Sequence, residues 1–246
     1  MGAMVGSAAQ GITPREALRA CPLFADLDEA SLDLVAAALR QRRFRRGETI
    51  FHAGDPGDAL FIVSEGAVKI TIPSDDGSEP AILTTIGPGG FFGVLSLLDG
   101  APRSATAVAL DASTAHLLRR DAFDGLVDRE PAVRRAALVA LAHEIRRLTA
   151  QVEDLHFLDL PGRLARHILR TLALGMGRDP ADADDLVGEH RLPWPYTQTE
   201  LAGMIGGSRQ SVNRLLSDLV AEGLVRFDGD ELVIPDAGRL ALAARR

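Results

Sequence analysis

The chain has 246 residues, of which 46% are hydrophobic and 25% are charged. These values are typical of a folded globular protein, and they exclude a wholly disordered or collagen-like chain. The formal net charge is −7, so any contact with a polyanion must come from a few well-placed cations. The single cysteine, Cys21, excludes a disulfide or a thiolate zinc site within one chain.

The first part of the sequence contains few structural signals. Residues 1–20 have small side chains without a hydrophobic period, and we expect a flexible arm there. They lack the basic and apolar regions of a secretory signal, and no stretch approaches about eighteen consecutive apolar residues. We therefore expect a cytoplasmic protein without a membrane span. From Phe24 to Leu39 an apolar period with acidic residues at its start predicts a short amphipathic helix.

Between Gly47 and Asp121 glycine-rich turns separate short apolar runs. The runs are Thr49–Phe51, Leu60–Val63, Val68–Ile72, Ile82–Ile86, Phe91–Phe92, Thr106–Leu110 and Ala115–Leu118. Turns at this spacing are typical of an all-β barrel or jelly roll. The sequence therefore predicts an antiparallel β-roll in a domain over residues 21–130.

After Pro131 the apolar residues recur in steps of three and four positions. They are Leu138, Leu141, Ile145, Leu148, Val152 and Leu155. A narrow stripe of this kind with charged flanks is typical of a two-stranded coiled coil, whereas a helix buried in a globular core usually has a wider apolar face. We predict a dimerisation helix over residues 131–160 that forms a parallel homodimer. A globular core helix is the alternative.

Residues 161–246 have the pattern of a winged helix-turn-helix domain. A short helix near Leu201 is followed by the turn Gly206–Gly207, and Ser208 is placed to cap a second helix. The expected buried face of that helix contains Val212, Leu215, Leu216 and Leu219. Two apolar runs around Asp228–Gly229 predict a hairpin, which would be the wing. A helical hairpin with no role in DNA binding is the plainer alternative.

The exposed face of the second helix carries side chains that can read bases. Arg209 and Arg214 are the only cations between Leu192 and Val225. Arg can bind guanine through two hydrogen bonds, and Gln or Asn can bind adenine in the same way. The predicted DNA-contacting residues are Thr197, Gln198, Ser208, Arg209, Gln210, Ser211, Asn213 and Arg214. We predict duplex DNA as the partner, because 4% aromatic content argues against single-strand recognition by stacking.

Three segments of the chain resemble the cyclic AMP receptor protein and fumarate–nitrate reductase regulator family of transcription factors. They are Arg46–Asp58, Phe91–Ala105 and Gly206–Arg214, and the resemblance extends from about Phe24 to Ile234. It implies an α+β fold with a cyclic-nucleotide-binding-like β-roll, a long dimerisation helix and a winged helix-turn-helix. It also implies a non-enzymatic regulator that recruits or blocks RNA polymerase. A two-fold dimer predicts an inverted-repeat DNA site.

The same resemblance implies a phosphate-binding segment over residues 93–105. Gly93, Leu95, Arg103 and Ser104 would surround a cyclic phosphate, with Thr84 nearby. Leu148 and Thr149 stand at positions where the family has two hydroxyl residues that contact adenine. Val94 stands where cyclic AMP binders have a Glu that accepts a hydrogen bond from the ribose 2′-hydroxyl. Loss of that bond costs about 1 to 3 kcal/mol.

The identity of the effector stays open on the sequence. Cyclic AMP, another anionic effector such as a cyclic dinucleotide, and activity without a ligand are the three alternatives for the roll, and a structural ion pair is the alternative for Arg103. A haem gas sensor would need an axial ligand such as His52, His116, His143 or His156. A metal-dependent enzyme on a jelly roll would need clustered His and carboxylate ligands. The roll has only two histidines, His52 and His116, and no His-x-His pair. We therefore expect no metal site and no enzymatic activity.

Overall fold

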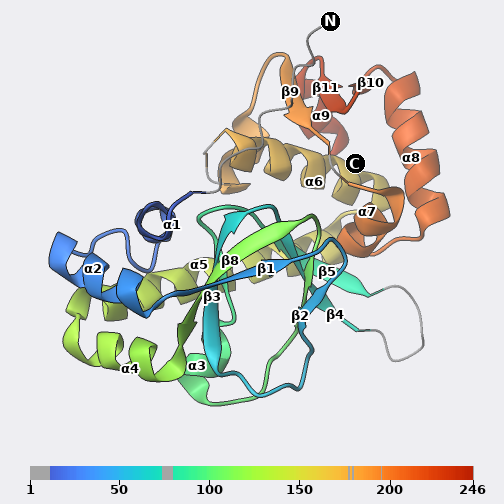
Figure 1. Cartoon of the computed structure of the whole chain (residues 1–246). Coiled ribbons are helices and arrows are strands. Elements are labelled where there is room, and N and C mark those ends of the chain that lie inside the picture. The colour runs from blue at the N-terminus through green and yellow to red at the C-terminus, as the bar shows by residue number, and fades with distance from the viewer. Residues whose placement is uncertain (1–11, 74–79, 177, 179, 195, 246) are drawn as a thin grey trace, which may run out of the picture. The chain divides into compact units, whose positions relative to one another are not determined.

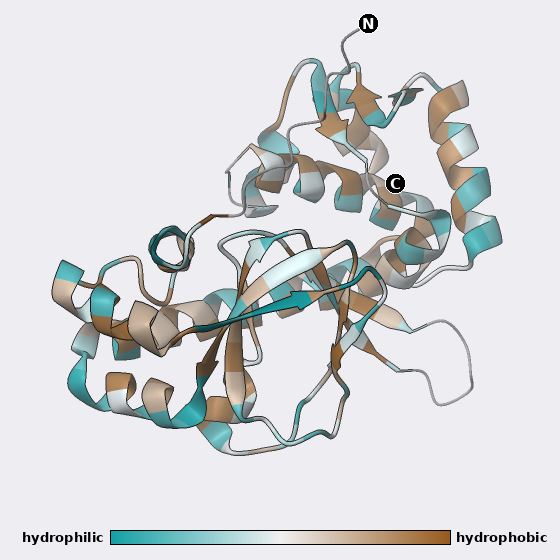
Figure 2. Cartoon of the chain, in the orientation of Figure 1, coloured by the Kyte–Doolittle hydropathy of each residue, from teal (hydrophilic) through white to brown (hydrophobic). Residues whose placement is uncertain are grey.

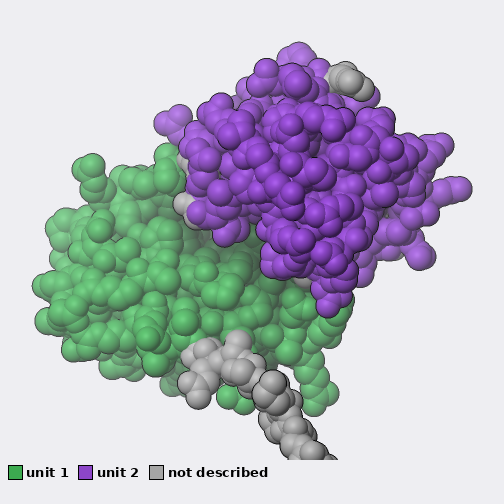
Figure 3. Space-filling model, turned by 90° about the horizontal axis from the view of Figure 1, so that it is seen from above, with its two compact units in different colours: residues 1–76, 82–144 green, residues 77–81, 145–246 purple. Residues whose placement is uncertain are grey.

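The computed structural model describes residues 12–73, 80–176, 178, 180–194 and 196–245. The chain divides into two compact units, residues 1–76 with 82–144 and residues 77–81 with 145–246 (Figure 3). The boundary falls inside the long helix α5 (Pro131–Phe157). Two apolar clusters lie in the first unit and one lies in the second.

The first unit contains two four-stranded sheets, which form the predicted antiparallel β-roll (Figure 1). One sheet has the strand order β1-β8-β3-β6 and the other has the order β2-β7-β4-β5. The strands are β1 (Arg40–Phe44), β2 (Thr49–Phe51), β3 (Ala59–Glu65), β4 (Val68–Ile72), β5 (Ala81–Ile86), β6 (Phe91–Phe92), β7 (Thr106–Ala109) and β8 (Ser113–Arg119). Each of the seven apolar runs in the sequence forms a strand. The alternation of core and turn residues therefore located most of the roll.

Strand β1 was not predicted, because its sequence, RQRRF, has a single apolar residue. It pairs in antiparallel register with β8, so that Arg42 lies opposite Ala115. Only Phe44 is buried on this edge strand, and the strand is coloured as hydrophilic in Figure 2. Its strand conformation thus comes from hydrogen bonding to a buried neighbour rather than from an apolar face of its own.

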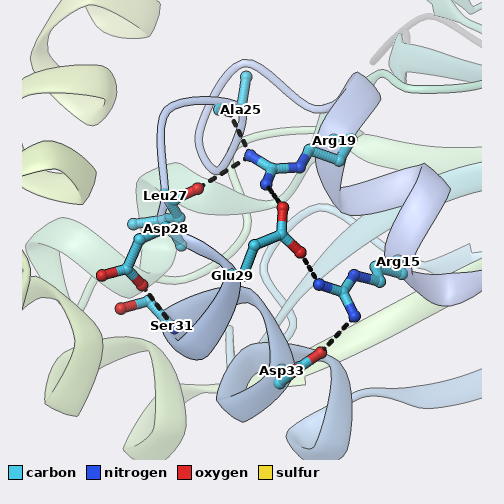
Figure 4. Close-up of polar contacts among 8 residues, drawn as sticks. All are labelled: Arg15, Arg19, Ala25, Leu27, Asp28, Glu29, Ser31 and Asp33. Atoms are coloured by element: carbon cyan, nitrogen blue, oxygen red, sulfur yellow. Dashed lines mark hydrogen bonds and ion pairs between the residues drawn. The ribbon is translucent and has the colours of Figure 1, made fainter.

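The expectation of an arm over residues 1–20 is wrong for α1 (Pro14–Ala20), while residues 1–11 lie outside the described chain. Thr13 caps α1 through reciprocal hydrogen bonds with Glu16, and the helix buries Ala17 and Leu18 completely. Its two arginines, shown in Figure 4, form ion pairs with acidic residues of α2. Seven residues are too few to show a helical period, which explains why no helix was expected here.

Three further helices complete this unit. They are α2 (Glu29–Ala38), α3 (Val94–Asp99) and α4 (Arg120–Arg129). The helix expected over residues 24–39 begins only at Glu29, because the Asp28 carboxylate accepts a hydrogen bond from the Ser31 amide at 2.8 Å and so caps it. Helices α1, α2, α4 and the start of α5 share one apolar cluster with the outer face of β3.

Strand β3 separates the two apolar clusters of the first unit. Phe61 and Val63 belong to the interior of the roll, whereas Leu60 and Ile62 belong to the cluster that the helices cover. This division follows from the strand's period of two. Strand β3 is therefore buried on both faces and closes one side of the roll interior.

The second unit contains the end of α5 and a helical domain with a small sheet. Its elements are α6 (Leu160–Gly175), the 3-10 helix η1 (Pro180–Asp185), β9 (His190–Pro193), α7 (Gln198–Ile205), α8 (Arg209–Ala221), β10 (Arg226–Asp228), β11 (Glu231–Ile234) and α9 (Ala237–Ala243). The predicted hairpin is confirmed as β10 and β11, and β9 adds a third strand that the sequence did not indicate. Pro161 lies in the first turn of α6, where proline is well tolerated, and Asp159 caps that helix.

The helices α6, α7, α8 and α9 of this unit pack around a common apolar core. The four residues expected on the inner face of α8 are buried or half-buried. In the part of the chain that the structure describes, no helix is both long enough and apolar enough to cross a membrane.

Candidate functional site

Arg103 is a buried cation shortly before the strand β7. The residue is 4% exposed, and its two terminal nitrogens donate hydrogen bonds of 2.7 Å to the carbonyl oxygens of Gly93 and Ala59. Its Nε atom is buried and has no hydrogen-bond partner among the described residues. Burial lowers the pKa of the guanidinium. Among the described residues, main-chain carbonyl oxygens hold Arg103, and the structural ion pair considered as its alternative role is not formed.

The guanidinium of Arg103 also lies over two aromatic rings. Its Cζ atom is 4.3 Å from the centroid of the Phe51 ring and 5.8 Å from that of Phe61. Phe61 stacks on Phe92 with centroids 5.0 Å apart. The cation thus has an apolar, ring-lined environment in which its charge is attracted to the ring faces. From the sequence these three phenylalanines could be assigned to strands only, since their clustering depends on strand pairing.

Gly93 lies beside Arg103 and accepts a hydrogen bond from it. It adopts φ +83° at the start of α3, and a Cβ atom there would be 2.5 Å from Nη1 of Arg103. Both the left-handed backbone and the close approach therefore require glycine. Its carbonyl fixes the guanidinium, so these two residues form one unit of structure.

The other cassette residues are less enclosed. Leu95 is 43% exposed and Ser104 is exposed, while Thr84 on β5 is half-buried. Val94 is half-buried and packs against the apolar cluster that the helices cover. A carboxylate at position 94 would therefore lie next to apolar side chains.

Leu148 and Thr149 lie on α5 in the second unit. The Thr149 hydroxyl donates a hydrogen bond of 2.9 Å to the carbonyl of Ile145 within the helix, and Leu148 is 38% exposed. Leu138, Ile145, Val152 and Leu155, which belong to the predicted seam, are between 53% and 68% exposed. A shallow apolar groove of about 490 Å³ is lined by Ile145, Leu148, Thr149, Val152, Glu153, His156 and Phe157.

The two helices of the helix-turn-helix have well-formed caps. Thr197 accepts a hydrogen bond from the Glu200 amide and caps α7, and Gly206, with φ +70°, follows the last residue of that helix. Ser208 accepts from the Ser211 amide at 3.1 Å and caps α8. Three of the residues predicted to contact DNA, Thr197, Ser208 and Ser211, therefore also form the N-terminal caps of these two helices.

The exposed face of α8 contains the four predicted base-reading residues. Arg209, Gln210, Asn213 and Arg214 are all exposed. Asn213 accepts a hydrogen bond of 2.7 Å from Gln198 on α7. Arg209 and Arg214 form no ion pair with any residue that the structure describes, which leaves both guanidinium groups available to an external acceptor.

The histidines considered as haem ligands lie in different environments. His116 on β8 is 2% exposed and its Nε2 atom has no partner among the described residues, whereas His52, His143 and His156 are exposed. Burial lowers the pKa of His116. Over the described ranges, no group of three or more His, Cys, Asp or Glu residues is placed to hold a metal ion.

Comparison with protein families matches both parts of the chain. Residues 41–130 match the cyclic nucleotide-binding domain, and residues 162–243 match the Crp-like helix-turn-helix domain. The first match contains the roll with Arg103, and the second contains α7, α8 and the three-stranded sheet.

Relatives match over nearly the whole chain. The CRP-like cAMP-activated global transcriptional regulator of Mycobacterium tuberculosis is 34% identical over 230 residues, which covers 94% of this chain and 99% of the relative. The cyclic AMP receptor protein of Thermus thermophilus is 31% identical over 226 residues, covering 91% and 96% of the two chains. Of solved structures, FixK2 from Bradyrhizobium japonicum has a TM-score of 0.71 at 22% identity, covering 83% of this chain and 96% of that one. The c-di-GMP-responsive regulator CLP of Xanthomonas campestris has a TM-score of 0.68 at 23% identity, covering 85% and 99%.

Proposed function

This chain belongs to the cyclic AMP receptor protein and fumarate–nitrate reductase regulator family of transcription factors, and from this membership we propose how it recognises DNA and its effector. The proposed active form is a homodimer that binds an inverted repeat in duplex DNA and acts on RNA polymerase. The proposed location is the cytoplasm, because such a regulator must reach the DNA that it controls.

The observation that carries the DNA-binding part of the proposal is the exposed face of α8. Arg209 and Arg214 project from a helix whose N-terminus is capped by Ser208, and neither guanidinium forms an ion pair in the described chain. In helix-turn-helix proteins the N-terminal residues of the second helix contact base edges in the major groove. In a protein of net charge −7, two such arginines at this position favour specific readout over general attraction to phosphate.

The exposed stripe on α5 supports the homodimer. Ile145 and Val152 are 65% and 54% exposed on the seam, and a long apolar stripe of this kind is normally covered by a partner. A second copy of the chain is the proposed occupant, because the period of the stripe is that of a two-stranded coiled coil. Two recognition helices related by a two-fold axis then predict half-sites about 34 Å apart, one turn of DNA.

For the effector, we propose an anion that carries a phosphate group and binds at Arg103. The support is a buried guanidinium with one unpaired donor, Nε, next to the glycine that the family uses at its phosphate site. The M. tuberculosis relative is described as cAMP-activated, and CLP as c-di-GMP-responsive. A cyclic nucleotide is therefore the proposed class, with cyclic AMP as the first candidate.

The test is selection of binding sites from a random duplex library by the full-length protein, with and without cyclic AMP. We expect an inverted repeat with half-site centres about one helical turn apart, and tighter binding when the effector is present. Recovery of a single half-site, or of no preferred sequence in either condition, would contradict the proposal.

A further inference from the structure

The stacking of Arg103 on Phe51 restrains the cation that the proposed effector needs. Cζ lies 4.3 Å from the ring centroid of Phe51, well within the range of about 6 Å over which a cation is attracted to a ring face. The two terminal nitrogens are held at 2.7 Å by the carbonyl oxygens of Ala59 and Gly93. The ring therefore holds the face of the guanidinium, and the main chain holds its end.

In this resting position the edge of the guanidinium that contains Nε is buried. A phosphate usually binds two adjacent N–H groups of an arginine, but Nε of Arg103 is buried and unpaired among the described residues. Because that edge is buried, an anion binds there only after the guanidinium moves from this position. A buried donor without a partner is also unfavourable, so the resting state leaves one donor that an incoming anion would satisfy.

We propose that Phe51 sets the affinity of the roll for phosphate-bearing effectors by holding Arg103 in this resting position. The inference rests on the proposed effector role of Arg103 and identifies a residue that regulates it. Phe51 is a positioning residue, because it acts through the guanidinium and needs no contact with the phosphate. The attraction between ring and cation opposes binding, so its removal strengthens binding.

Phe92 provides a matched control within the same aromatic cluster. Its ring centroid is 5.0 Å from that of Phe61 and 5.8 Å from that of Phe51. Among the described rings, Arg103 lies over Phe51 and Phe61 and not over Phe92. Replacing Phe92 by leucine thus creates similar space in the roll without releasing the guanidinium.

The experiment is calorimetric titration of the full-length protein with cyclic AMP as the probe, for wild type, Phe51→Leu and Phe92→Leu. We expect Phe51→Leu to tighten binding by about five- to thirtyfold, which extends from the upper value for an exposed cation–ring contact to that for a desolvated one. Phe92→Leu should change binding by less than about twofold. Hydrogen exchange of the Arg103 guanidinium in the free protein should be faster in Phe51→Leu. If that variant does not fold, Phe51→Met, which keeps most of the volume without a ring, takes its place.

The inference is wrong if removing the Phe51 ring gives no gain in affinity, if Phe92→Leu gives an equal gain, or if exchange at Arg103 is unchanged. An equal gain would mean that space, not release of the cation, controls binding. Absence of cyclic AMP binding in every protein also counts against it. Binding of the same proteins to the selected inverted repeat tests the DNA-binding function separately, because Phe51 lies outside the helix-turn-helix.

Discussion

Nε2 of Gln198 on α7 donates a hydrogen bond of 2.7 Å to Oδ1 of Asn213 on α8. An asparagine needs both its oxygen and its nitrogen to bind adenine through two hydrogen bonds, and here the oxygen is already engaged. Asn213 is therefore less free to read a base than Arg209 or Arg214, which have no ion-pair partner in the described chain. The side chains on this face therefore differ in how freely they can contact a base, a difference that the sequence pattern does not show.

We accordingly expect Arg209→Ala and Arg214→Ala each to weaken specific DNA binding by about tenfold or more, because each removes a guanidinium that can bind a base or phosphate. Asn213→Ala should cost less. Fluorescence anisotropy with the selected duplex measures the effect. The control is Arg239→Ala, which replaces an exposed arginine on α9. It should leave the affinity for DNA within about twofold of the wild-type value.

Gln210→Glu should change base preference rather than overall affinity. An amide side chain pairs with adenine, whereas a carboxylate accepts from the amino group of cytosine. Repeating the site selection with this variant should move the preference at one position of each half-site towards cytosine. Identical selection profiles for wild type and variant would show that Gln210 does not face the bases.

The dimer seam can be tested with two charged substitutions. Ile145→Glu combined with Val152→Glu should give a monomer by sedimentation, since carboxylates would face their copies across the two-fold axis. A monomer presents one recognition helix, so DNA binding should weaken strongly. His143→Glu combined with Arg146→Glu, on exposed positions off the seam, should remain dimeric. If the seam variant remains a dimer, α5 does not form the dimer interface.

Val94→Glu should strengthen cyclic AMP binding by about tenfold, because it supplies an acceptor for the ribose 2′-hydroxyl. Val94 packs on the apolar cluster of the helices, so a modest loss of stability is also expected. Val94→Leu, which adds no acceptor, controls for size. If wild type already binds at low micromolar affinity and Val94→Glu binds equally well, position 94 does not control ligand choice. Weaker binding of a different effector would indicate a pocket rebuilt for it.

The elements that have an apolar period could be predicted from the sequence, and those that depend on pairing or caps could not. Seven strands of the roll, α5 and the helix-turn-helix followed from spacing alone. Strand β1 is arginine-rich and α1 is one short capped helix, so neither has a detectable period. At the candidate site, Gly93 and Arg103, which the resemblance places around a phosphate, lie together. The carbonyl of Ala59 and the ring of Phe51 were not foreseeable, because any residue supplies a carbonyl and strand pairing alone places that ring.

His167 on α6 has the most strongly shifted pKa of the described histidines. Burial, with a smaller contribution from the charge of Arg170, lowers this pKa to about 4. Its Nε2 atom has no partner among the described residues, and its ring meets that of Tyr196 edge-on at 5.8 Å. The folded state therefore holds this imidazole neutral.

The unfolded chain should bind a proton at this histidine more readily than the folded chain, because an unperturbed histidine titrates near 6.5. Between that pH and about 4 the unfolded state binds more protons, so the free energy of unfolding falls as the pH falls through this window. The difference between the two pKa values corresponds to a loss of up to about 3 kcal/mol. Urea unfolding followed by the fluorescence of Trp194, the only tryptophan, reports on this unit directly.

His167→Gln removes the titrating group and should flatten the dependence of stability on pH between about 6.5 and 4. His156→Gln, at an exposed histidine on α5, should leave the wild-type slope unchanged and serves as the control. A wild-type slope that persists in His167→Gln would assign the acid sensitivity to another group. If the imidazole is buried and neutral, His167→Gln should have a higher free energy of unfolding than wild type at about pH 4.5 and no higher value at about pH 7.5.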